Sequence, residues 1–272
     1  MTASSPADPG PASRAGLGRH HVEQVMGMAV SVDIRDRCSP AEAVDEVVAW
    51  LHHVDDTFST HKPESPISAL GRGEVTLDEV DPDIGVVLRL CEDIRWRSEG
   101  VFDVFEVPAP NGTTLDPSGL VKGWSIERAA GILERHGCGD FCINAGGDIA
   151  LRGRPEQASR WRIGIRHPDD ATALALVIEA DGPLGVATSA TYERGPHIID
   201  PRIHRPATAV ASATVVGPDL TLADAYATVV FIMGLDGLDW IEDQPGYDAY
   251  VITHDQRTHW TPGFATYRNP SR

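Results

Sequence analysis

Two polar residues lie four positions apart in the segment ADAYAT, which spans residues 223–228. In a helix, Asp224 and Thr228 would lie on one face, and both side chains could reach a single cation. Their oxygen atoms are hard donors, and Mg²⁺ commonly takes one or two protein oxygens while water and substrate phosphate fill its other positions. The alternative for this pair alone is a solvated Asp and a Thr that bonds to its own helix backbone.

A second pair brackets two apolar residues in HIIDP, at residues 197–201. A strand here would bury an isoleucine and present His197 and Asp200 at its polar ends. With an ordinary pKa near about 6.5, His197 could accept a proton from a hydroxyl nucleophile, and Asp200 could orient it. The alternative is a structural histidine in a turn.

The segment DPSGLVKG, at residues 116–123, combines a turn with the start of a helix. The first helical residues would be Ser118 and Gly119, whose free N–H groups point out of the turn and could hold a phosphate. Lys122 could reach back to that phosphate as a point charge, although a surface lysine is the ordinary alternative.

Glycines and hydroxyls supply a fourth group of candidates. Gly146 and Gly147 in INAGGDI would let a ligand approach the main chain closely. Thr188 and Ser189 follow a buried strand in the segment ATS. Each motif alone is weak evidence, but their number and order predict a site that handles a diphosphate with magnesium.

Charge and length narrow the class of protein. The 272 residues carry a formal charge of −17, which disfavours binding to nucleic acid or to anionic lipid. An anionic small substrate would then need a local positive cluster or a metal ion. The composition is that of an ordinary globular domain.

Strands between these motifs occur in groups and do not alternate regularly with helices. This grouping disfavours a doubly wound fold and predicts an α+β fold. We expect strands at Val25–Ile34, Phe141–Asn144, Trp161–Arg166, Leu174–Ile178 and Val210–Val216, and helices from Pro40, over Ile84–Trp96, over Gly119–His136 and from near Asp219.

We predict a flexible N-terminal tail over residues 1–20 and a single domain over residues 21–272. The four cysteines form no CxxC pair, so buried free thiols are expected. No targeting signal, lipidation cysteine or membrane-spanning run is evident, which predicts a cytoplasmic protein.

The five segments DPSGLVKGW, INAGGDI, ATSATYERG, HIIDPR and ADAYAT, in this order, resemble the signature segments of the FAD:protein FMN transferase (ApbE) family. The similarity runs from about Val25 to Thr253. It implies mostly antiparallel sheets flanked by helices, in a T-fold-like architecture. It also implies a magnesium-dependent enzyme that moves the FMN half of FAD, through a phosphoester, to a Thr or Ser of a target flavoprotein and releases AMP.

The resemblance also implies roles for individual residues. Asp224, Thr228 and the main-chain carbonyl of Val121 would bind magnesium, while His197 would act as the base and Asp200 would orient it. The residues implied at the FAD site are Ser59, His61, Ser118, Lys122, Asn144, Gly146, Gly147, Asp148, Thr188 and Ser189.

The chain departs from the family pattern at several positions. His61 replaces a tyrosine, Pro117 lies in a DPSG turn in place of DLGG, and Ala190 replaces a glycine. Ile203 and His204 replace the usual Thr-Gly pair next to the expected base, where they bear on acceptor fit and rate.

Two other functions fit the same motifs. Water in place of the acceptor hydroxyl would make the chain an FAD pyrophosphatase that yields FMN and AMP, and an inactive relative would only bind FAD. The sequence contains no clear match to the family's acceptor pattern, so self-flavinylation is not expected. The expected partner is a separate acceptor flavoprotein in the cytoplasm or on the cytoplasmic face of a membrane complex.

Overall fold

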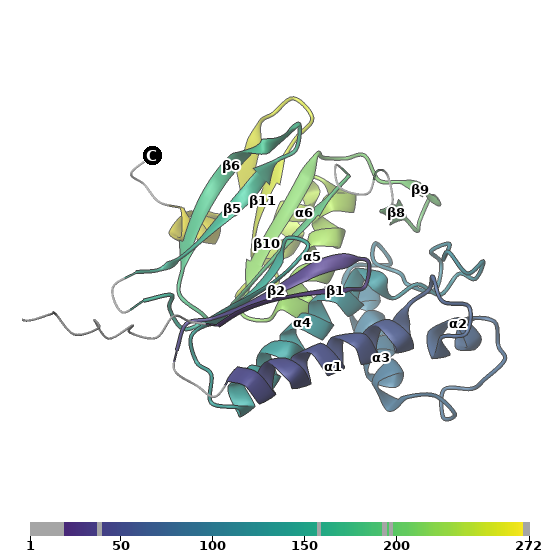
Figure 1. Cartoon of the computed structure of the whole chain (residues 1–272). Helices are drawn as coiled ribbons and strands as arrows, with labels where there is room; N and C mark the ends of the chain where they lie inside the picture. The colour runs from purple at the N-terminus through teal and green to yellow at the C-terminus, as the bar shows by residue number, and fades with distance from the viewer. Residues whose placement is uncertain (1–18, 37–39, 157–158, 192–194, 196–197, 269–272) are drawn as a thin grey trace, which may run out of the picture.

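An eight-stranded sheet forms the centre of the computed structural model, which describes residues 19–36, 40–156, 159–191, 195 and 198–268 (Figure 1). Its strand order is β1-β2-β3-β4-β7-β10-β11-β12, and every neighbouring pair is antiparallel. The bounds are β1 Arg19–Val25, β2 Met28–Ile34, β3 Phe141–Ala145, β4 Asp148–Arg152, β7 Leu184–Ala190, β10 Ser212–Gly217, β11 Asp248–Ile252 and β12 Thr258–Trp260.

Helices pack against one face of this sheet. Their bounds are α1 Pro40–Phe58, α2 Pro66–Gly71, α3 Pro82–Arg97, α4 Ser118–Arg135, α5 Leu220–Met233 and α6 Asp236–Glu242. Helices α4 and α5 contact the sheet and each other, α1 and α3 pack on α4, and α6 packs on α5 (Figure 1). The larger hydrophobic core fills the space between these helices and the sheet. This arrangement confirms the predicted α+β fold with mostly antiparallel strands.

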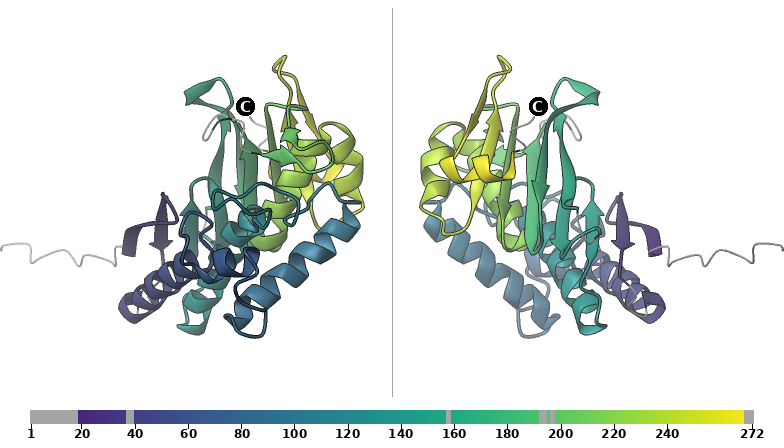
Figure 2. Two further views of the ribbon diagram at one scale, coloured as in Figure 1. Left: turned by 90° about the vertical axis from the view of Figure 1, so that its right-hand side faces the viewer. Right: turned by 90° about the vertical axis from the view of Figure 1, so that its left-hand side faces the viewer.

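A second hydrophobic core lies on the opposite face. It is covered by the hairpin of β5 (Trp161–His167) and β6 (Asp170–Ala180) and by the 3₁₀ helix η1 (Pro262–Tyr267), which lies beside β6 and β11 (Figure 2). Alternating burial along β5 places Trp161, Ile163 and Ile165 in this core. Both cores share one sheet, so the two layers are held together by the same strands.

Capping signals set several helix starts. Asp81 and Asp219 are the N-cap residues of α3 and α5, and each side chain accepts a hydrogen bond from a main-chain N–H of the first turn. Proline follows the cap in α3, where the missing N–H costs nothing. The four predicted helices, which are α1, α3, α4 and α5, begin within a few residues of their expected positions.

The strand predicted over Val25–Ile34 is wrong in one respect. The segment contains a hairpin turn, because Met26 and Gly27 have positive φ angles of 53° and 70° and separate β1 from β2. Hydrophobic residues on both sides of this tight turn made it look like one continuous strand. The sheet also begins at Arg19, so residues 19 and 20 belong to β1 rather than to the predicted tail.

The cysteines differ in part from the prediction. Cys91 and Cys142 are free thiols, as expected, and burial raises the pKa of both. Cys138 is disulfide-bonded, so the prediction of free thiols is wrong for this residue. Among the described residues, no helix combines the length and the apolar character needed to cross a membrane.

Candidate functional site

A cavity of about 800 Å³ opens where the start of α4, the β3–β4 turn, the end of β7 and the middle of α5 meet. These elements bring together motifs that are more than a hundred residues apart in the chain. The predicted site residues that line the cavity are Ser59, His61, Ser118, Val121, Lys122, Gly146, Gly147, Thr188, Ser189, Asp224 and Thr228.

Asp148 and Asn144 do not line the cavity, but both side chains contact residues that do. Asp148 is 1% exposed; its Oδ2 lies 2.7 Å from Lys122 Nζ, and its Oδ1 accepts a hydrogen bond of 3.2 Å from the N–H of Thr188. The Asn144 side chain accepts a hydrogen bond of 2.9 Å from the N–H of Gly147 and closes the β3–β4 turn. Their contacts fix the lysine and the glycine turn.

Asp224 is a buried carboxylate at the floor of the cavity. Its Oδ2 accepts a hydrogen bond of 2.8 Å from the N–H of Gly123, and its Oδ1 lies 3.7 Å from Lys122 Nζ. Burial raises the pKa of Asp224 to about 8; Lys122 opposes this shift and the Asp148 carboxylate adds to it. Two buried carboxylates therefore share one lysine, and the ionised form of Asp224 gains from a further positive charge.

The hydroxyl groups next to Asp224 complete a set of oxygen donors. Thr228 follows one helical turn later, and its Oγ1 lies 3.3 Å from Ser189 Oγ. Val121, in the first turn of α4, also lines the cavity. Hard oxygen donors around a buried carboxylate with a raised pKa fit a magnesium ion, which Asp224, Thr228 and the carbonyl of Val121 would hold.

The start of α4 differs from the prediction in detail. The N–H of Ser118 donates to Asp116 Oδ1 at 3.0 Å, so the acidic side chain of the DPSG turn already occupies the group expected to bind phosphate. Leu120 and Val121 both donate to the carbonyl of Pro117. Ser118 still lines the cavity, but a phosphate there would have to use its side chain or displace Asp116.

The loop after α1 forms another wall. Ser59 accepts hydrogen bonds through its carbonyl from Ser65 Oγ at 2.8 Å and from the N–H of Lys62 at 3.2 Å. The Lys62 ammonium contacts Asp55 at 2.6 Å and Asp56 at 2.7 Å. These contacts hold the loop, with Ser59 and His61 at the cavity.

The HIIDP segment reaches the cavity through its apolar residues. Ile198, Ile199 and Pro201 line it, and β8 (Ile199–Asp200) pairs with β9 (Arg205–Pro206) just outside. Arg202 binds both oxygens of Asp200, at 2.9 and 2.8 Å, and these hydrogen bonds hold the pKa of Asp200 below its ordinary value. His197 lies outside the described residues, so the predicted contact between the two residues stays a prediction.

Apolar side chains also line the cavity, and the motifs did not identify them. Met26 and Met28 come from the β1–β2 turn, Phe58 from the end of α1, Phe102 from the loop after α3, and Ile165 from β5. The segments around Phe58 and Phe102 show a weak signal, because FSTHKPES at residues 58–65 and GVFD at residues 100–103 loosely resemble family segments. The others read as ordinary core residues in the sequence.

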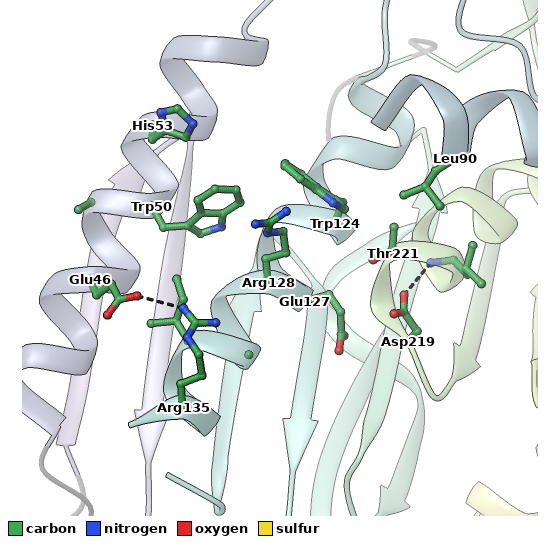
Figure 3. A pocket seen from close by; sticks show the side chains of 14 residues that line it. Glu46, Trp50, His53, Leu90, Trp124, Glu127, Arg128, Arg135, Asp219 and Thr221 are labelled. Carbon is green, nitrogen blue, oxygen red and sulfur yellow. Dashed lines mark hydrogen bonds and ion pairs between the residues drawn. The ribbon is translucent and has the colours of Figure 1, made fainter. Parts of the chain in front are cut away.

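A second cavity, of about 810 Å³, lies on the helical side between α1, α4 and the start of α5 (Figure 3). The guanidinium of Arg128 lies 4.8 Å from the ring centre of Trp50 and 5.2 Å from that of Trp124. Glu127 and Asp219 form the wall beside α5. None of the predicted site residues that the structure describes lines this cavity.

The fold and the first cavity together define an α+β protein with a deep cavity, at whose floor two buried carboxylates flank one lysine. The chain belongs to the ApbE family, whose model matches residues 26–109 and 106–251. This confirms the family resemblance found in the motifs.

Curated relatives carry the name FAD:protein FMN transferase. The protein of Rhodobacter capsulatus is 29% identical over 266 residues, which cover 78% of this chain and 50% of the relative. The protein of Klebsiella pneumoniae is 26% identical over 166 residues, covering 57% of this chain and 46% of the relative. The chain thus spans about half the length of the curated relatives it matches.

Solved structures share the fold. The flavin transferase ApbE from Vibrio cholerae superposes with a TM-score of 0.80 at 22% identity, covering 92% of this chain and 99% of that one. The ApbE protein from Thermotoga maritima also gives a TM-score of 0.80, at 19% identity, and covers 93% of this chain and 100% of that one.

Proposed function

We propose that the protein is an FAD:protein FMN transferase that attaches FMN to a Thr or Ser of an acceptor flavoprotein and releases AMP. The observation that carries this proposal is the pair of buried carboxylates, Asp224 and Asp148, with the half-buried Lys122 between them at the floor of the cavity, within a chain of the ApbE family. A cavity of this size is within the range of about 300–1,000 Å³ that is usual for small-molecule sites.

The reaction exchanges one phosphorus–oxygen bond for another. The acceptor hydroxyl oxygen attacks the phosphorus of the FMN half of FAD, the diphosphate bond breaks, and AMP leaves with the electron pair of that bond. A magnesium ion at Asp224, Thr228 and the carbonyl of Val121 would neutralise charge on the diphosphate. Lys122, held by Asp148, would add a fixed positive charge at the same floor.

The remaining proposed FAD contacts come from several sides of the cavity. Ser59 and His61 lie on the loop wall, Gly146 and Gly147 on the glycine turn, and Thr188 and Ser189 at the end of β7. Asn144 keeps the glycine turn closed. A dinucleotide in the cavity would contact the main chain of the glycine turn on one side and the cation site at the floor.

Intact mass of an acceptor flavoprotein, after incubation with this protein, FAD and magnesium, tests the proposal. We expect the acceptor to gain the mass of one FMN, and we expect Asp224→Asn to abolish this gain. An unchanged acceptor with release of FMN and AMP would show an FAD pyrophosphatase instead. FAD that stays intact with every acceptor offered would leave only flavin binding.

The acceptor proton is assigned to His197 in this proposal, with Asp200 as its orienting carboxylate. We expect His197→Ala to reduce the rate of transfer by about 10²- to 10⁴-fold while FAD affinity stays near that of the wild type. Single-turnover transfer and an FAD titration measure the two quantities separately. A full transfer rate in His197→Ala would refute the assignment of the base.

A further inference from the structure

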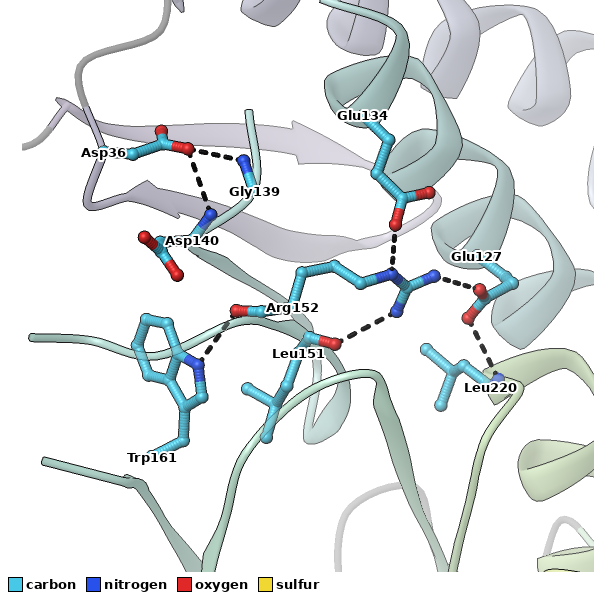
Figure 4. A network of polar contacts seen from close by, with 9 residues as sticks. All are labelled: Asp36, Glu127, Glu134, Gly139, Asp140, Leu151, Arg152, Trp161 and Leu220. Atoms are coloured by element: carbon cyan, nitrogen blue, oxygen red, sulfur yellow. Dashed lines mark hydrogen bonds and ion pairs between the residues drawn. The ribbon is translucent and has the colours of Figure 1, made fainter. Parts of the chain in front are cut away.

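A buried arginine connects the sheet to the helices near the cation site (Figure 4). Arg152, at the end of β4, is 8% exposed. Its guanidinium binds the Glu127 carboxylate, donates to Glu134 at 2.7 Å, and donates to the carbonyl of Leu151 at 3.1 Å. Both glutamates belong to α4, so the network joins β4 to that helix.

Glu127 extends this connection to α5. Its second carboxylate oxygen, Oε2, accepts a hydrogen bond of 3.0 Å from the N–H of Leu220, the first residue of α5 (Figure 4). A main-chain N–H in the first turn of a helix has no partner within the helix. Glu127 therefore satisfies a group that the helix cannot satisfy itself, and it fixes the place where α5 begins.

Helices α4 and α5 are joined a second time, one turn away. The N–H of Gly123 on α4 donates to Asp224 on α5 at 2.8 Å. Gly123 precedes Glu127 by four residues, and Asp224 follows Leu220 by four residues, so the two hydrogen bonds are one turn apart on both helices. A shift of α5 along its axis would break both hydrogen bonds.

Two glycines allow this close approach. A Cβ atom on Gly123 would lie 2.5 Å from the carbonyl oxygen of Leu220, and one on Gly185 of β7 would lie 2.7 Å from Leu220 Cα. The first turn of α5 is thus confined between α4 and the sheet. Within this confined space, Glu127 accepts the hydrogen bond from its first N–H.

We propose that Glu127 is a positioning residue, which holds the start of α5 and thereby fixes Asp224 at the cation site. Strand β4 adds a second tie, because Asp148 at its start binds Lys122 and Arg152 at its end binds Glu127. Glu127 itself does not line the first cavity, so it acts through α5. This inference rests on the proposed function in one respect, the cation at Asp224.

The network contains its own control residue. Glu134 binds the same arginine as Glu127, but none of its hydrogen bonds or ion pairs within the described residues reaches α5, and its side chain is 48% exposed. Glu127→Gln keeps the size of the side chain but removes its charge from Arg152 and places an amide between the two partners. Glu134→Gln makes the same chemical change without a contact to α5.

The test measures the affinity for Mn²⁺, as a substitute for Mg²⁺, by electron paramagnetic resonance on the full chain with saturating FAD and no acceptor. We expect Glu127→Gln to weaken Mn²⁺ binding by roughly 10- to 100-fold. Glu134→Gln should stay within about twofold of the wild type. Thermal unfolding without metal is recorded for both variants. It separates a general loss of stability from a specific loss of Mn²⁺ affinity.

Wild-type Mn²⁺ affinity in Glu127→Gln, or an equal loss in Glu134→Gln, would overturn the positioning role while the proposed function stands. A wild-type chain that binds no Mn²⁺ would overturn the cation site and the inference with it. Arg152→Gln tests the same contacts from the other end, should Glu127→Gln fail to fold. It removes the guanidinium that fixes the Glu127 side chain, so the Glu127–Leu220 hydrogen bond should weaken with it, and unchanged Mn²⁺ affinity in this variant would also overturn the proposal.

Discussion

Asp224→Asn is expected to reduce FMN transfer by about a thousandfold, which corresponds to about 4 kcal/mol of transition-state stabilisation. The amide keeps the shape of the side chain and can still accept the hydrogen bond from the N–H of Gly123. It removes the negative charge that holds the cation, so Mn²⁺ affinity should fall in parallel. The transfer rate and the Mn²⁺ titration check the two effects independently.

The same substitution is expected to stabilise the metal-free protein at high pH. The pKa of Asp224 is raised to about 8 by burial, so between its ordinary value and about 8 the folded state holds a proton that the unfolded state has released. Stability of the wild type therefore falls as pH rises through this window, whereas the asparagine variant lacks this loss. Urea unfolding in EDTA at about pH 5 and about pH 9 should show a gap that widens with pH.

Asp219→Asn is the matched control for both measurements. Asp219 is the N-cap of the same helix and lies outside the first cavity. Asparagine caps a helix about as well as aspartate, so transfer should remain within about twofold of the wild type. If the difference in the free energy of unfolding between Asp224→Asn and the wild type stayed the same at every pH, this would contradict a buried carboxylate with a raised pKa.

The sequence predicted best the features that depend on residues close together in the chain. Asp224 and Thr228 are one helical turn apart, and helix periodicity alone places them on the same face. The glycine turn at Gly146 and Gly147 is equally local, and φ angles of 57° and 99° confirm that it needs glycine. Such features follow from short-range geometry.

Features that depend on tertiary contacts could not be predicted in the same way. The contact between the Lys122 ammonium and Asp148, which is 26 residues further along the chain, was not predicted. Only a loose resemblance of GVFD to a family segment pointed to Phe102, and nothing in the motifs indicated that Ile165 would face the cavity, because an apolar residue on a core element looks the same whether it faces a ligand or a neighbour.

Gly123→Ala is expected to destabilise the protein by about 1–3 kcal/mol, despite the higher helix propensity of alanine. The new Cβ would lie 2.5 Å from the carbonyl oxygen of Leu220 and 2.6 Å from Asp224 Cβ. Helix α5 cannot move aside, because Gly185 of β7 already lies against the other side of Leu220. The strain would therefore fall on Asp224, and Mn²⁺ affinity should drop together with stability.

Gly131→Ala, on the same helix, separates this clash from the effect of alanine itself. A Cβ atom there would meet only Arg135 Nη1, at 4.0 Å, so the variant should be as stable as the wild type or more stable by up to about 1 kcal/mol. If α5 is confined between α4 and the sheet, urea unfolding should show a lower free energy of unfolding than the wild type for Gly123→Ala, and an equal or higher one for Gly131→Ala. If Gly123→Ala matched Gly131→Ala in stability and in Mn²⁺ affinity, the two helices would have room to separate, and the position of Asp224 would not depend on their close contact.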